Sequence, residues 1–135
     1  MLAAFSLTAV MGMSGLAVEL STGYATKVRN QRVADMAALG AALSYQSNSS
    51  ESQATQTARD IIAASGLPAG AATVTLPVTI GSTTGVQVRI TTAVPVRLAT
   101  MISSAATYNV STSAIASLNG STSPACVLSL SKTAS

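Results

Sequence analysis

The sequence contains no histidine, no tryptophan, one cysteine and only 8% charged residues. Histidine is the commonest general base and metal ligand, so its absence removes the side chain on which most catalytic and zinc sites depend. The sequence also lacks a phosphate-binding loop, a dinucleotide glycine motif, Cys-x-x-Cys and Gly-x-Ser-x-Gly. We therefore expect a protein that is not an enzyme, with no catalytic residue, cofactor, metal site or small-molecule substrate.

The four acidic residues are too scattered to act as a carboxylate pair. Glu19 and Asp35 fall on one expected helix, about 24 Å apart along its axis. Glu51 lies in a polar turn and Asp60 adjoins Arg59, so both are expected to be solvated charges.

The basic residues and the single cysteine give little indication of a partner. Of the seven basic residues only Lys27, Arg29 and Arg32 cluster, and no aromatic stripe interleaves with them, so we expect no nucleic-acid binding. Cys126 has three interpretations: a buried thiol, an intermolecular disulfide, or half of a pair whose partner is missing.

The N-terminal stretch MLAAFSLTAVMGMSGLAV is uncharged and mostly apolar, and Leu20 extends it past Glu19. A run of about 18 such residues is at the lower limit for a helix that spans a bilayer. A signal peptide would need a basic region before the run and a small-x-small cleavage site after it. A core helix that is apolar on all sides would be too large for one small domain to enclose. We therefore favour a transmembrane helix over residues 1–20.

Small residues in this stretch, Gly12 and Gly15 among them, give it a face suited to contact with another transmembrane helix. Glu19 has two interpretations: a carboxylate at the membrane interface in contact with water, or the counter-charge of a positive group on a neighbouring subunit. The prepilin pattern of type IV pilins does not fit, because there the apolar run follows the glutamate, and here it precedes Glu19.

The helical pattern continues to about Tyr45, so residues 21–46 are expected to be the soluble continuation of the same helix. Asp35 is either a solvated charge paired with Arg32 or Gln31, or a clamp between this helix and the following domain. Alanines make one side nearly flat, so another helix can approach closely. The flat side consists of Ala34, Ala37, Ala38, Ala41 and Ala42, and a narrow apolar stripe consists of Met36, Leu39 and Leu43. The candidate assembly contacts are Gly12, Gly15, Glu19, Ala34, Asp35 and Ala38.

Residues 47–135 are expected to form an extracytoplasmic α+β domain. A capping box at Ser50 and Gln53 begins a second helix, and Gly66 with Pro68 ends it. We expect this helix to fold back on the first with a buried face of Ala54, Ala58, Ile61 and Ile62.

Beyond the second helix the apolar pattern changes to period two. Strands are expected over 73–80 and 86–90, joined by a five-residue loop at 81–85, with Pro77 marking an edge strand. A short helix from Pro95 to Ala105, a strand over 108–114, a loop over 119–124 and a strand over 126–130 complete the prediction. The fold class is therefore α+β, in which a long N-terminal membrane-spanning helix continues into a small antiparallel-sheet domain with two shorter helices.

The stretch GLAVELSTGYATKVRNQRVADMAALGAAL resembles the N-terminal region of TadG-like proteins, the Flp/Tad pilus-assembly family. Residues 15–18 match a Gly-Leu-Ala-Val-Asp-like segment, with Glu19 in place of the aspartate. The following helix matches at Gln31, Ala34, Asp35, Ala37, Ala38 and Leu39, and departs at Asn30 and Val33. The segment ACVLSLSKTAS around Cys126 is similar to the Cys-x-Leu-x-Leu segment of the family.

The resemblance implies a structural component of Tad/Flp pilus assembly, or a minor-pilin-like protein, in the bacterial cytoplasmic membrane. Its domain would lie in the periplasm or outside the cell, and its partners would be membrane lipid, other transmembrane helices and pilus or complex subunits. The basic residues after the apolar stretch, taken alone, would place that side in the cytoplasm. Two alternatives remain open: an accessory single-pass subunit of a larger membrane complex, and a small adhesin or binding module that uses the sheet edge around Pro77.

Overall fold

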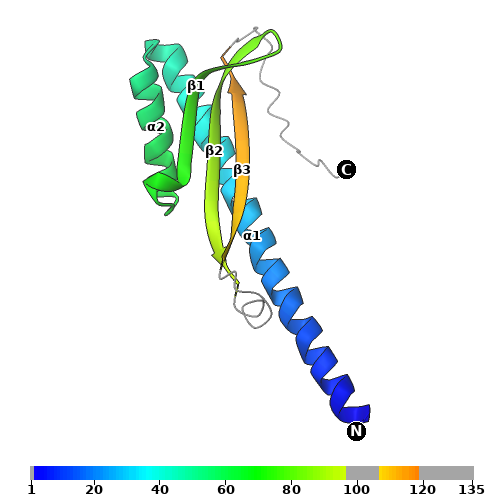
Figure 1. The fold of residues 1–135 in the computed structure, drawn as a ribbon. Helices are drawn as coiled ribbons and strands as arrows, with labels where there is room; N and C mark the ends of the chain where they lie inside the picture. Colours follow the sequence, from blue (N-terminus) through cyan, green and yellow to red (C-terminus); the bar gives the residue numbers. More distant parts are fainter. Residues whose placement is uncertain (1, 97–106, 119–135) are drawn as a thin grey trace, which may run out of the picture.

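The computed structural model describes residues 2–96 and 107–118, and among them the side chains from Ala17 onward except those of Ala69 and Ile80. The expected α+β class is confirmed, with two helices followed by a three-stranded antiparallel sheet (Figure 1). The elements are α1 (Leu2–Asn48), α2 (Glu51–Ala64), the 3₁₀ turn η1 (Ala69–Ala71), β1 (Ala72–Ile80), β2 (Thr83–Pro95) and β3 (Thr107–Ser117).

The helix α1 is continuous over 47 residues, as the absence of proline predicts. It ends at Asn48, where Ser49 takes a left-handed conformation with φ of 50°. The sheet packs against its C-terminal half, while its N-terminal part projects well beyond the sheet (Figure 1). The sheet therefore covers mainly the C-terminal half of this helix.

Both ends of α2 follow the sequence signals. The Ser50 hydroxyl accepts a hydrogen bond from the Gln53 backbone N–H at 3.4 Å, which caps the N-terminus. At the C-terminus Gly66, with φ of 75°, donates to Ala63 O, and Leu67 N donates to Ile62 O. These two bonds form a Schellman motif, which requires the positive φ that glycine adopts without strain.

The sheet has the order β1-β2-β3, so β1 lies at an edge as Pro77 predicts. The pairing of β1 with β2 shifts between Thr75 and Val78, around this proline. The expected five-residue loop at 81–85 is wrong, because Ile80 pairs with Thr83 and leaves a two-residue turn. Gly81 has φ of 60° at the first turn position, which permits a tight hairpin and lets the ladder begin at the β-branched Thr83.

The strands β2 and β3 are longer than expected and pair without interruption from Gly85 with Ser117 to Pro95 with Thr107. The Thr- and Val-rich segment after Ile90 continues the alternation, which extends β2 to Pro95. The expected start of a short helix at Pro95 is wrong, because Pro95 is the last residue of β2 and pairs with Thr107. Residues 97–105 of that helix, the expected strand over 126–130 and Cys126 lie outside the described residues. Of the two expected shorter helices the structure therefore describes α2.

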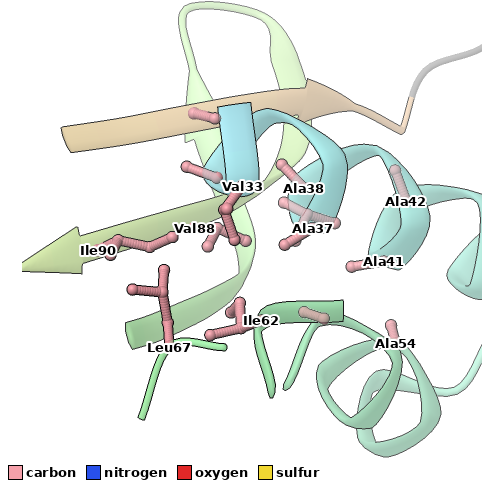
Figure 2. Close-up of a cluster of buried hydrophobic side chains, with 14 residues drawn as sticks. Val33, Ala37, Ala38, Ala41, Ala42, Ala54, Ile62, Leu67, Val88 and Ile90 are labelled. Atoms are coloured by element: carbon pink, nitrogen blue, oxygen red, sulfur yellow. The ribbon is translucent and has the colours of Figure 1, made fainter. Parts of the chain in front are cut away.

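The core lies where α1, α2 and one face of the sheet meet (Figure 2). α1 covers β2 and β3, whereas α2 packs on α1 and lies beside β1. The predicted face of α2 is confirmed at Ala54, Ala58 and Ile62, and Ile61 is half-buried. The opposite face of the sheet is exposed and rich in Ser and Thr, as at Thr91 and Ser111, whose hydroxyls lie 3.2 Å apart.

Candidate functional site

The flat alanine side of α1 is used inside the chain itself. Ala34 is 0% exposed and Ala38 is 1% exposed, and both lie in the core beneath α2 and the sheet. Ile61 of α2 approaches so closely that a Cβ at Gly40 would lie 2.4 Å from its Cδ1. The close helix contact that the alanines predict is therefore made with α2 of the same chain, and these two candidate contacts face inward.

Asp35 combines the two interpretations considered for it. It is exposed and accepts a hydrogen bond from Gln31 Nε2 at 2.9 Å, the partner that the spacing predicts. Gln31 Nε2 also donates to the carbonyl oxygen of Ser113 in β3 at 3.3 Å. An amide nitrogen has two protons and can make both bonds. Asp35 thus orients a side chain that joins α1 to the outer edge of the sheet.

Glu19 and the two candidate glycines lie on the projecting part of α1. Gly12 and Gly15 are within the helix, and their surroundings lie outside the described residues. Glu19 is half-buried and takes part in an interaction. Nearby apolar side chains face outward, with Val18 66% and Leu20 74% exposed. The described part of the domain therefore leaves these two side chains uncovered.

The side of α1 opposite the alanines carries the predicted apolar stripe, which consists of Met36, Leu39 and Leu43 and is called the outer stripe below. These side chains are 52%, 57% and 57% exposed. Their spacing of three and four residues keeps them on one face of the helix. The stripe thus runs along the outside of the α1 segment that supports the sheet.

A second surface on α1 was not predicted from the sequence. An open groove of about 490 Å³, called the basic groove below, runs along α1 beside the end of α2. It is lined by Tyr24, Ala25, Val28, Arg29, Arg32, Val33, Met36 and Ser65. The available signal was the cluster of Lys27, Arg29 and Arg32, which coincides with apolar residues at helical spacing.

Arg29 has a structural partner in the basic groove. Its Nη2 donates a 2.9 Å hydrogen bond to the carbonyl oxygen of Ser65, the C-cap of α2. α2 has no basic residue in its last turn, so Arg29 of α1 supplies the positive charge that stabilises the C-terminal end of the helix dipole. The arginine therefore fixes the end of α2 against α1.

A buried polar cluster lies between α1 and the sheet. Asn30 is 0% exposed, and its Nδ2 donates to Thr92 Oγ1 at 2.9 Å. Asn30 Oδ1 and the Thr112 hydroxyl are buried with no hydrogen-bond partner in the described part of the protein. The sequence pattern gives no signal for this cluster, because Asn30 lies among residues that read as an exposed, charged segment.

The edge at Pro77 adjoins a more polar groove of about 460 Å³ between α2 and β1. Its lining includes Glu51, Arg59, Val74 and Leu76. Over the residues that the structure describes, no three His, Cys, Asp or Glu side chains gather as a metal site would require. The groups that line these surfaces include apolar side chains, hydroxyls, guanidinium groups and the carboxylate of Glu51.

The described side chains, which begin at Ala17, include no helical stretch long and apolar enough to cross a membrane. The expected span over residues 1–20 falls mainly on side chains outside this description. Comparison with protein-family models, with curated proteins and with solved structures finds no significant match.

Proposed function

We propose that this chain is a structural, membrane-anchored component of a bacterial envelope assembly, of the Tad/Flp pilus-assembly or minor-pilin-like type. The observation that carries the proposal is the form of α1: one 47-residue helix whose N-terminal part projects from the domain that its C-terminal half supports (Figure 1). Among the side chains described from Ala17 onward, the first buried position of α1 is Gly23, against which the Tyr108 side chain of β3 packs. A helix that leaves its own domain needs another apolar environment to bury its side chains.

The sequence of the projecting part supports lipid as that environment. Residues 1–18 are uncharged and mostly apolar, and their helix would extend about 27 Å, close to the thickness of the hydrocarbon core of a bilayer. Gly12 and Gly15 would allow a neighbouring helix to approach in the membrane. The resemblance to TadG-like proteins supports the pilus-assembly role and the periplasmic or external position of the domain.

Membrane fractionation tests the anchor. Deletion of residues 2–18, or the double substitution Ala9→Arg with Val10→Arg, should move the protein from carbonate-washed membranes to the soluble fraction, because arginine at the centre of a bilayer is costly. The matched control is Ser47→Arg with Asn48→Arg, which adds the same charge at the opposite end of α1. The control protein should stay in the membrane fraction.

Two results would contradict the proposal. A deleted protein that still sediments with membranes would show that another part of the chain anchors it. Labelling of Cys126 by an impermeant maleimide only after cell lysis, with the thiol shown to be reactive, would place the domain in the cytoplasm. Purification of the native assembly separates the pilus role from the accessory-subunit alternative, since filaments favour the former and stoichiometric recovery with an integral membrane complex favours the latter.

A further inference from the structure

The basic groove has the chemistry of a site for a membrane lipid. We propose that it binds the headgroup of an anionic phospholipid, with the lipid phosphate at Arg29 and Arg32 and the acyl chains directed along the apolar residues toward the anchor. This inference rests on the proposed membrane anchoring and adds a specific lipid partner to it.

The form of the groove suits an amphipathic ligand. Two rows of α1 residues at i, i+4 spacing border it, and the surface between such rows is a natural groove on a helix. One row is Tyr24, Val28, Arg32 and Met36, and the other is Ala25, Arg29 and Val33. Each row therefore places one guanidinium among apolar side chains. A free inorganic anion would use only the guanidinium groups, whereas a phospholipid would use both kinds of surface.

The basic side chains of this segment have few counter-charges among the described residues. No acidic residue occurs between Glu19 and Asp35, a stretch that contains three basic residues. Over the described residues, the side chains of Lys27 and Arg32 form no hydrogen bond and no ion pair. Arg29 uses one nitrogen for Ser65 O, and a guanidinium has further N–H donors for a phosphate. Charge complementarity therefore favours an anionic partner.

The groove begins at the headgroup layer, which extends about 5–8 Å beyond the hydrocarbon core on each side. At about 1.5 Å per residue, Tyr24 is about 6 Å, Arg29 about 14 Å and Arg32 about 18 Å beyond Leu20, the end of the proposed span, so the two arginine side chains would extend back toward the membrane to meet the phosphate. Helical side chains lean toward the N-terminus, which directs Arg32 and the exposed Lys27 back toward the membrane. The exposed Tyr24, a residue type enriched at membrane interfaces, lies between the lipid and the arginines.

Lipid retention by the full chain in a neutral detergent tests the proposal. The protein is equilibrated in micelles that contain equal amounts of phosphatidylglycerol and phosphatidylcholine, repurified, and analysed for bound lipid by native mass spectrometry. The wild type should retain phosphatidylglycerol selectively. Arg32→Gln should reduce that selectivity about fivefold, the contribution expected of one cation near an anionic lipid surface. Arg32 is the chosen position because it makes no contact that the fold needs.

The matched control is Arg59→Gln, which removes the same charge from an exposed position on α2 outside the groove. It should retain phosphatidylglycerol as the wild type does. Equal losses in both variants would mean that only net charge matters and would overturn the proposal, as would equal retention of the two lipids by the wild type. Complete competition by inorganic phosphate would identify a free-anion site and would also overturn it.

This experiment can fail independently of the proposed function. The measurement is made in micelles on the intact chain, so it does not depend on where the protein fractionates in cells. Suppose that deletion of residues 2–18 releases the protein from membranes, but that the intact chain shows no lipid selectivity. The membrane anchor would then stand, and the lipid site would be excluded.

Discussion

The Thr112 hydroxyl is the clearest unfavourable feature of a single residue in this structure. Thr112 is 6% exposed on the α1-facing side of β3, where its oxygen has no hydrogen-bond partner among the described residues. A buried polar group without a partner costs about 1–3 kcal/mol. The Oδ1 atom of Asn30 on α1 also has no hydrogen-bond partner among the described residues, although the Asn30 amide nitrogen donates to Thr92 Oγ1.

We expect Thr112→Val to increase the free energy of unfolding by about 1 kcal/mol, because valine keeps the shape and removes the unpaired hydroxyl. The matched control is Thr91→Val on the exposed face of β2, which should change stability by less than about 0.5 kcal/mol. Urea denaturation of the full chain in neutral detergent, followed by circular dichroism, measures both. A loss of stability in Thr112→Val would show that the hydroxyl has a partner, for example a water molecule shared with Asn30.

Residue-level features that depend on local sequence were predictable, whereas those that depend on tertiary contacts were not. Ser50 caps α2 and Asp35 pairs with Gln31 because both interactions join residues three or four positions apart. The Asn30–Thr92 bond joins α1 to β2, and no spacing rule connects those positions. The bond from Arg29 to Ser65 O was missed for the same reason.

At the scale of elements, the contact between α1 and α2 depends on small side chains. Ala58 of α2 is 0% exposed, and Gly40 of α1 accommodates the end of Ile61. Extra methyl groups in a packed interior force side chains out of their rotamers and shift the backbone. The alanine-rich composition of both helices is thus a packing requirement of this pair.

Ala58→Leu should therefore lower the free energy of unfolding by about 1–3 kcal/mol. Ala63→Leu, the same substitution at an exposed position of the same helix, should have an effect below about 0.5 kcal/mol. Thermal unfolding of the two variants, compared in one detergent buffer, gives the difference. If both variants unfold at the same temperature as the wild type, the helices are not packed as closely as the structure describes.

The order and type of α1, α2 and the three strands were predictable, because each shows a sustained period of 3.6 or two residues, whereas the short 3₁₀ turn η1 was not predicted. The length of the first hairpin loop was not, since the Thr83–Gly85 segment reads equally well as turn or strand. Gly85 pairs with Ser117 in the ladder, and a Cβ there would lie 2.7 Å from Ala116 O of β3, so the close approach of β3 requires glycine at this position. Such a requirement depends on the neighbouring strand, which is distant in sequence.

For the whole molecule, α1 carries several surfaces with different neighbours. Its alanine side holds the domain together, its projecting part is proposed to lie in lipid, and the basic groove lies between the two. The outer stripe remains uncovered by the described part of the chain. Leu39 and Leu43 are each 57% exposed, and both lie on the half of α1 against which the sheet packs. A protein that assembles with other chains requires an exposed apolar surface of this kind. Covering it with a second helix removes apolar area from water, which favours association.

We expect Leu39→Glu with Leu43→Glu to weaken self-association of the full chain without unfolding it. Full burial of a leucine side chain contributes about 1.5–3 kcal/mol, so loss of two such contacts should raise the dissociation constant at least about tenfold. Gln53→Glu with Ala63→Glu adds the same charge at exposed positions of α2 and should leave association unchanged. Light scattering after size exclusion in neutral detergent measures the distribution of species, and circular dichroism monitors the fold. An unchanged distribution in the stripe variant would exclude the outer stripe as the contact between copies, and assembly would then have to use the anchor or the sheet.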